Sequence, residues 1–209
     1  MKSIIKMVSV LSVLCAVAGF VLSYLKISTV TPIENQLLTY VQGPAILNVF
    51  KDVENSPIQE RKSFAVGGGK NINVFPAIKD GKLFGVAIEG FGQGFGGDIG
   101  VMVGFNVNDD SLINIDITTH KETPGLGSRV SEDSFKKQFE GKPLHAVLLK
   151  SQGGEIDAIS GATVSSNGTV LAINDAGNQY KALKKEIINT WNSGAKNEFL
   201  QGIHQRAVE

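Results

Sequence analysis

Residues 101–118 read VMVGFNVNDDSLINIDIT, and this stretch decides the fold. Apolar and polar side chains alternate with a period of two from Val101 to Val107 and again from Ile113 to Thr118, which is typical of half-buried strands. Between them, Asn108-Asp109-Asp110 supplies turn-forming residues. The pattern predicts two neighbouring strands of an antiparallel sheet.

A second pair of strands precedes this stretch. Asn73–Ile78 and Leu83–Glu89 flank Asp80-Gly81, a dipeptide that strongly favours a hairpin turn. The sheet is therefore expected to begin near Ile72. Nine of the 24 glycines lie between Gly81 and Gly104, which indicates tight turns and close backbone approaches.

The residues after the sheet predict helices. Ser131 is expected to cap a short helix that carries Phe135 and Phe139 on one face. His145–Lys150 is predicted as a further strand, and the main helix is expected from Ser165 to about Ile188. The fold class is α+β, with an antiparallel sheet packed against helices.

The composition excludes several classes of protein. The formal charge is zero and the 20 basic residues are dispersed, so nucleic-acid binding is not indicated. A single cysteine, Cys15, excludes disulfides, a four-cysteine zinc site and a cysteine-ligated iron–sulfur cluster within the chain. No histidine pair has metal-ligand spacing, and no metal site is expected.

The N-terminus carries a candidate membrane anchor. Met7–Leu25 contains no charged residue and would rise about 28 Å as a helix, enough to cross a bilayer core. Lys2 and Lys6 outweigh Lys26, which predicts a cytoplasmic N-terminus with the rest of the chain outside. A cleaved signal peptide is the alternative, because Ala16-Val17-Ala18 suits a signal peptidase. The apolar run continues beyond that tripeptide, which favours the anchor.

These patterns divide the chain into a cytoplasmic N-terminus (1–6), a transmembrane helix (7–25), a linker with a helical connector (26–70), a domain (71–193) and a loose C-terminal tail (194–209). Within the linker, Pro32 is expected to start a helix and Gly43-Pro44 to break it. A helix through Ile46, Leu47 and Phe50 should follow, and Asn55–Lys70 should be irregular.

Gly92–Gly97 matches the Gly-x-Gly-x-x-Gly fingerprint of dinucleotide-binding folds. That fingerprint requires a helix directly after it, whereas the residues from Asp98 onward have the period of a strand. We therefore expect a wide turn or bulge here and no Rossmann site.

Residues 160–166, Ser-Gly-Ala-Thr-Val-Ser-Ser, stand where an apolar run gives way to the main helical pattern. Backbone amides at a helix start lack intrahelical acceptors and the helix dipole is positive there, so the segment is a candidate anion site. Thr163 adds an alcohol that can become an ester of a bound phosphate. Taken alone, the segment is more typical of a plain helix start.

A second segment, His120–Gly127 (HKETPGLG), follows a predicted strand. Gly125 and Gly127 would let the backbone approach a flat ring closely, and Leu126 offers an apolar face. Its alternative interpretation is a simple strand-to-helix connection.

Together these segments resemble a known family. Asp157–Thr163 (DAISGAT) resembles the Asp-x-x-Ser/Thr-Gly-Ala-Thr signature recognised by transferases that attach FMN to proteins. Glu122–Gly127 (ETPGLG) is similar to the second hallmark of the FMN-binding domain in the G subunit of Rnf electron-transport complexes. The C subunit of the sodium-pumping NADH:quinone reductase shares this domain. The likeness extends from Gly81 to about Tyr180, and Gly96–Ile99 with the short chain favours the Rnf type.

The resemblance implies that Thr163 carries FMN as a phosphoester, installed by a separate flavin transferase from FAD with magnesium and recognised through Asp157. The phosphate would lie at the helix N-terminus and the isoalloxazine against residues 122–127. The residues implied in cofactor binding are Ser160, Gly161, Ala162, Thr163, Ser165, Ser166, Glu122, Thr123, Pro124, Gly125, Leu126 and Gly127.

By the same likeness, the chain would relay electrons beside sister subunits of a complex in the bacterial inner membrane. That complex would couple ferredoxin–NAD exchange to sodium or proton translocation. No acid–base or nucleophilic constellation is visible, so no turnover by this chain alone is expected. The alternatives are the C subunit of a quinone reductase, a tethered domain that binds an anionic ligand without a covalent bond, and a purely structural subunit.

Overall fold

The computed structural model describes residues 2–51, 53–67 and 69–206. The chain divides between Tyr40 and Val41 into two compact units, each of which is described by itself.

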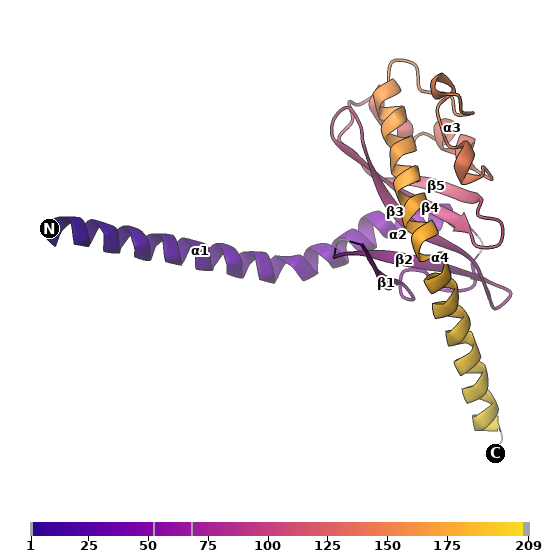
Figure 1. Ribbon diagram of the computed structural model, residues 1–209, viewed down its shortest axis with the longest axis horizontal. Coiled ribbons are helices and arrows are strands. Elements are labelled where there is room, and N and C mark those ends of the chain that lie inside the picture. The colour runs from indigo at the N-terminus through magenta and orange to yellow at the C-terminus, as the bar shows by residue number, and fades with distance from the viewer. Residues whose placement is uncertain (1, 52, 68, 207–209) are drawn as a thin grey trace. The chain divides into compact units, whose positions relative to one another are not determined.

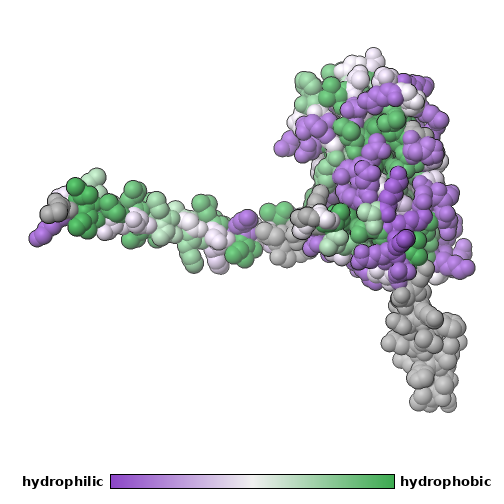
Figure 2. Space-filling view, in the orientation of Figure 1, coloured by the Kyte–Doolittle hydropathy of each residue, from purple (hydrophilic) through white to green (hydrophobic). Residues whose placement is uncertain are grey.

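The first unit is a long apolar helix, α1 (Lys2–Leu37). Its segment Lys2–Thr29 is long and apolar enough to cross a membrane, and Figure 2 shows mainly apolar surface along much of this helix. The predicted span 7–25 lies inside this segment. Pro32 lies within the helix, so the prediction that it starts a new one is wrong.

The second unit opens with α2 (Gly43–Val49), which follows a π-helical turn at Leu38–Gln42. Pro44 occupies the first turn of α2, where a missing N–H removes no helix hydrogen bond. Ile46 is buried and Leu47 is exposed, because α2 packs one face against β4 and β5. The predicted connecting helix is confirmed.

Five antiparallel strands form one sheet in the order β1-β2-β3-β4-β5. The strands are β1 (Lys62–Val66), β2 (Lys70–Lys79), β3 (Lys82–Gln93), β4 (Asp98–Asn106) and β5 (Leu112–Thr119). Asp80 and Gly81 both have positive φ angles, as a two-residue hairpin turn requires. Both predicted strand pairs are confirmed, whereas β1 corrects the expectation that residues 55–70 are irregular.

A long helix, α4 (Thr163–Arg206), lies across one face of the sheet and packs against β3 and β4 (Figure 1). A Cβ atom built on Gly92 would lie 2.1 Å from the carbonyl oxygen of Gly168, and one built on Gly90 would lie 2.1 Å from that of Ala172. Only glycine permits this approach. The glycines of β3 thus bring the start of α4 against the end of the strand.

The buried core fills the space between α4 and the sheet. Phe105 of β4 stacks on Tyr180 of α4 with ring centroids 4.6 Å apart. Strand β4 follows Gly97 directly, so the expectation that no helix follows the glycine fingerprint is confirmed.

Between β5 and α4 the chain forms short helical turns, of which α3 (Asp133–Lys136) is one. Phe135 and Phe139 are both buried, but Phe139 lies in the 3-10 turn that follows α3, and Glu132 occupies the N-cap position expected for Ser131. The predicted strand 145–150 is wrong, because residues 144–146 form a 3-10 turn and only Leu149 makes a bridge, to Ile156.

The main helix also differs from its predicted bounds. It begins at Thr163 rather than Ser165, and its backbone continues to Arg206. The expected loose segment after Gly194 is therefore helical as far as the description extends.

Candidate functional site

A cavity of about 320 Å³ brings the two sequence motifs together. Three segments line it: the glycine turn between β3 and β4, the loop after β5, and the start of α4. The lining residues are Phe95, Glu122, Thr123, Leu126, Gly127, Gly161, Ala162, Thr163, Val164 and Ser165. A volume of this size suits a small-molecule site.

Thr163 is the first residue of α4, and it is exposed. Gly161 reverses the chain just before it with a φ of 79°, a conformation that glycine adopts without strain. The amide of Ser166 donates to the carbonyl of Ala162 over 2.9 Å and closes the first turn. The amides at 163–165 precede this bond and therefore have no intrahelical acceptor, so the wall that carries the Thr163 hydroxyl has positive potential.

Ser166 does not belong to this wall. It is fully buried, and its hydroxyl accepts from the amide of Ile159 over 2.9 Å and donates to the carbonyl of Ala162 over 3.0 Å. The hydroxyl hydrogen of Ser166 is thus donated inside the helix start, and Ser166 is not among the residues that line the cavity. It holds the chain reversal in place instead.

Glu122 also lines the cavity and is 5% exposed. Its Oε2 accepts from the Ser165 hydroxyl over 2.5 Å, and its Oε1 accepts from the amide of Gly96 over 2.9 Å. A Cβ atom built on Gly127 would lie 2.4 Å from Oε2, and one built on Gly94 would lie 2.4 Å from Oε1. The carboxylate therefore joins the three segments of the pocket, and two glycines make room for it.

Apolar side chains form the rim of the cavity. Phe95, Leu126 and Val164 are 74%, 46% and 52% exposed. Large exposed apolar side chains gathered in one place mark a binding surface. With helix-start amides on one side and apolar side chains on the rim, the lining is chemically compatible with a ligand that joins a phosphate to a flat ring.

Several predicted residues lie outside the lining. Ser160 is exposed beside it, and the Gly125 amide donates to the Ser128 hydroxyl over 2.9 Å within its own loop. Pro124 is exposed in the same loop. Asp157 is exposed and pairs with Lys150 over 2.8 Å, so its carboxylate faces the surface beyond the pocket.

Two contributors were missed from the sequence. Phe95 lines the cavity and Gly96 binds Glu122. Both lie in the turn Gly92–Gly97, which the sequence marked only as a rejected dinucleotide fingerprint. The glycines themselves were the available signal, because they indicated close backbone approaches.

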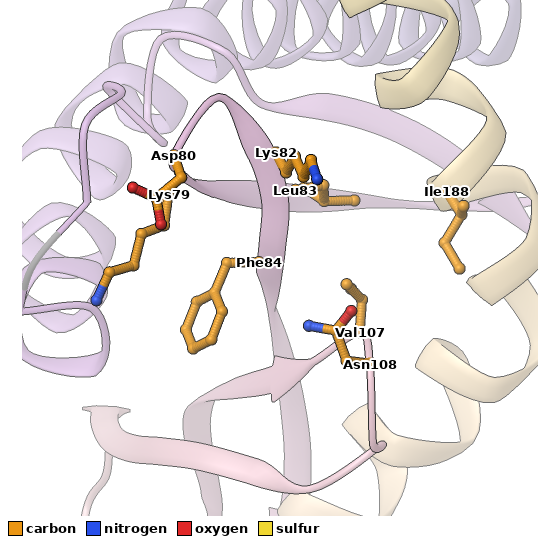
Figure 3. A pocket seen from close by; sticks show the side chains of 8 residues that line it. All are labelled: Lys79, Asp80, Lys82, Leu83, Phe84, Val107, Asn108 and Ile188. Atoms are coloured by element: carbon orange, nitrogen blue, oxygen red, sulfur yellow. The ribbon is translucent and has the colours of Figure 1, made fainter.

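A larger hollow of about 610 Å³ lies between the β2–β3 hairpin, the end of β4 and Ile188 of α4 (Figure 3). Phe84 and Val107 point into it, with Lys79 and Lys82 on its rim. Ile188 follows Thr163 by 25 residues, about 37 Å along the helix. This hollow is therefore separate from the site at the start of α4.

Residues 94–178 match the family model of the FMN-binding domain. The chain is 28% identical over 178 residues to the G subunit of the proton-translocating ferredoxin:NAD(+) oxidoreductase complex of Clostridium ljungdahlii, covering 84% of this chain and 90% of that protein. It is 29% identical over 184 residues to the G subunit of the ion-translocating oxidoreductase complex of Methanosarcina acetivorans, with coverage of 84% and 93%.

Among solved structures, the C subunit of the Na(+)-translocating NADH-quinone reductase from Parabacteroides distasonis has the same fold. The TM-score is 0.57 at 19% identity, and the match covers 74% of this chain and 95% of that chain. The matched domain contains both motifs that line the cavity, from Glu122–Gly127 to Gly161–Ser165. These similarities confirm the resemblance found in the sequence: residues 94–178 match the FMN-binding domain, and the chain is similar to the G subunits of ion-translocating oxidoreductase complexes.

Proposed function

We propose that this chain is a membrane-anchored electron-transfer subunit of an ion-translocating oxidoreductase complex, and that it carries FMN esterified to Thr163. The match to the FMN-binding domain and the two relatives from Clostridium and Methanosarcina support the cofactor and the complex. The observation that carries the covalent bond is the position of Thr163, an exposed alcohol in the pocket wall at the first residue of α4.

The attachment reaction uses FAD as the donor and a separate magnesium-dependent flavin transferase as the catalyst. The Thr163 hydroxyl oxygen bonds to the phosphorus of the FMN half of FAD, and the bond from that phosphorus to the AMP half breaks. AMP leaves and the hydroxyl proton passes to solvent. Exposure of Thr163, with Gly161 and Ala162 beside it, supports access by another protein.

The product is a phosphodiester with one negative charge. The unpaired amides at 163–165 and the positive end of α4 would stabilise that charge. Leu126, Phe95 and Val164 would exclude water from the ring. FMN accepts and releases one or two electrons when bound, while the protein supplies position and electrostatics.

The membrane topology is part of the proposal. Segment Lys2–Thr29 suits a single-pass anchor, and Lys2 and Lys6 at its start favour a cytoplasmic N-terminus. The domain would then lie on the outer, periplasmic side of the bacterial inner membrane. There a covalent tether would keep the flavin from being lost by dilution, and sister subunits would supply and receive the electrons.

Production of the chain with and without a flavin transferase tests the proposal. A denaturing gel under ultraviolet light should show a fluorescent band only with the transferase, and intact mass should rise by one FMN phosphoester. Thr163→Ala should remove both signals, whereas Thr123→Ala, which deletes the other threonine of the lining, should keep them. A fluorescent Thr163→Ala band would refute the site.

The same experiment separates the alternatives. Flavin that copurifies with the native protein but dissociates from it on the denaturing gel would indicate non-covalent binding. A protein free of flavin in both conditions would favour a structural subunit. Sister subunits identified by mass spectrometry of the purified complex would distinguish an Rnf-type complex from a quinone reductase.

A further inference from the structure

Glu122 is the charged side chain of the cavity among the described residues that line it. Its two oxygens both accept hydrogen bonds, one from the Ser165 hydroxyl and one from the Gly96 amide. This is the pattern of an ionised carboxylate, which has acceptors and no donor. The carboxyl group of Glu122 is therefore buried in the lining of the cavity, with both oxygens bonded to neighbouring segments.

We propose that Glu122 is a positioning residue that fixes the three pocket segments against one another, and that its charge lowers the reduction potential of a flavin bound in the cavity. This inference rests on the proposed function. The Ser165 bond connects the carboxylate to α4 two residues after Thr163, and the Gly96 bond connects it to the turn that carries Phe95.

The electrostatic effect follows from the surroundings. Reduction adds negative charge to a flavin, and a carboxylate nearby disfavours that charge. Glu122 is only 5% exposed, and low polarity around a buried group strengthens the interaction between charges. The hydrogen bonds from Ser165 and Gly96 spread part of the charge but leave its sign unchanged.

Glu122→Gln removes the charge and preserves the shape. The amide oxygen of glutamine can accept from Gly96, and its NH₂ group can donate to Ser165, whose hydroxyl is able to rotate. We expect the flavin-loaded variant to have a more positive midpoint potential in a redox titration against a reference dye. The equilibrium constant for reduction should rise about tenfold or more.

Ser165→Ala separates the charge from the packing. It removes one hydrogen bond to the carboxyl group but no charged side chain, so its midpoint potential should shift by much less than that of Glu122→Gln. A pocket that was merely loosened would give shifts of similar size for both substitutions. If Glu122→Gln fails to load flavin, a Ser165→Ala shift as large as the one expected for Glu122→Gln would overturn the inference.

Glu89→Gln is the matched control. Glu89 lies on β3 with its carboxylate bonded to Gln42 and Thr118, on the face opposite the glycines that contact α4. It should leave the potential unchanged. Equal potentials for Glu122→Gln and wild type, or shifts of similar size for both pocket variants, would overturn the inference while the loaded wild type upholds the proposed function. A wild type without flavin would overturn both.

Discussion

The Ser165 hydroxyl donates to Oε2 of Glu122 across 43 residues of sequence. This bond connects the loop after β5 to the first turn of α4, where Thr163 begins the helix. Both partners are buried, so water does not compete for the bond. The two sequence motifs, residues 122–127 and 160–166, thus both line the cavity and are connected by a direct hydrogen bond.

Gly127→Ala should disturb this junction. Its Cβ atom would lie 2.4 Å from the Glu122 carboxylate and 2.6 Å from the Ser165 hydroxyl, and both groups are fixed by their hydrogen bond. We expect a loss of about 1–3 kcal/mol in the free energy of unfolding and weaker flavin labelling. Thermal unfolding of the full chain in detergent measures the first effect, and in-gel fluorescence the second.

Gly67→Ala is the control for that substitution, because a Cβ atom there meets nothing within 4 Å. It should behave as wild type in both measurements. Equal melting temperatures for Gly127→Ala and Gly67→Ala would show that the pocket loops can move apart without cost.

Gly92→Ala tests how much the close packing of α4 on β3 contributes to stability. The added Cβ atom would lie 2.1 Å from the carbonyl oxygen of Gly168 and 2.6 Å from the amide of Ala172. Backbone atoms of a helix cannot turn aside as a side chain can, so α4 must shift. We expect destabilisation by about 2–3 kcal/mol or more, seen as a lower urea midpoint, with Gly67→Ala again unchanged. A wild-type midpoint would contradict the close packing of α4 on β3.

Ser166→Ala tests the role assigned to the buried hydroxyl. The substitution leaves the amide of Ile159 without its acceptor, and an unsatisfied buried donor costs about 1–3 kcal/mol. Flavin labelling of Thr163 should persist, because Ser166 lies outside the lining. The exposed Ser160→Ala is the control and should leave stability unchanged. If Ser166→Ala lost flavin labelling but kept wild-type stability, Ser166 would contribute to the ligand site and not to the stability of the helix start.

Local patterns were sufficient for part of the fold. Asp80-Gly81 marked a hairpin, and the alternation in 101–118 marked β4 and β5. In contrast, β1 escaped notice because Lys62–Val66 buries only Phe64, too few positions for a visible alternation. The strand predicted at residues 145–150 was wrong for the opposite reason. Val147 and Leu149 are buried as in a strand, but the backbone around them forms turns. Burial alone does not specify backbone conformation.

The site, like the fold, could be predicted only in part from the sequence. Thr163, Leu126 and Gly127 were identified because their motifs are contiguous in sequence. The bonds of Glu122 to Gly96 and Ser165 span 26 and 43 residues, and no local period reports a contact of that length. The role of Ser166 also depended on the path of the chain at Ile159, which only the folded structure defines.

Acid should weaken the contact between the β4–β5 turn and α4. Asp110 accepts from the Tyr180 hydroxyl over 2.7 Å and from Lys184 over 2.5 Å. Burial opposes ionisation, but these hydrogen bonds and the Lys184 charge hold the pKa of Asp110 below its usual value, while burial and the bond to Asp110 raise the pKa of Tyr180. A carboxyl whose folded pKa is lowered contributes stability above its unfolded pKa of about 4, and loses it as pH falls through the folded value.

Asp110→Asn should remove this pH dependence. Asparagine tolerates the φ of 60° at this position and keeps an oxygen for Tyr180, but it loses the charge that attracts Lys184. Because the pair is partly exposed, the variant should be less stable than wild type by at most about 1 kcal/mol at pH 7, and the difference should shrink as the pH falls below the unfolded pKa of about 4. Urea unfolding of the full chain in detergent over a series of pH values from 7 downward measures this. Glu186→Gln, an exposed change on the same helix, should show no such convergence, and a difference between wild type and Asp110→Asn that stayed constant as the pH fell would mean that the lost charge is not its cause.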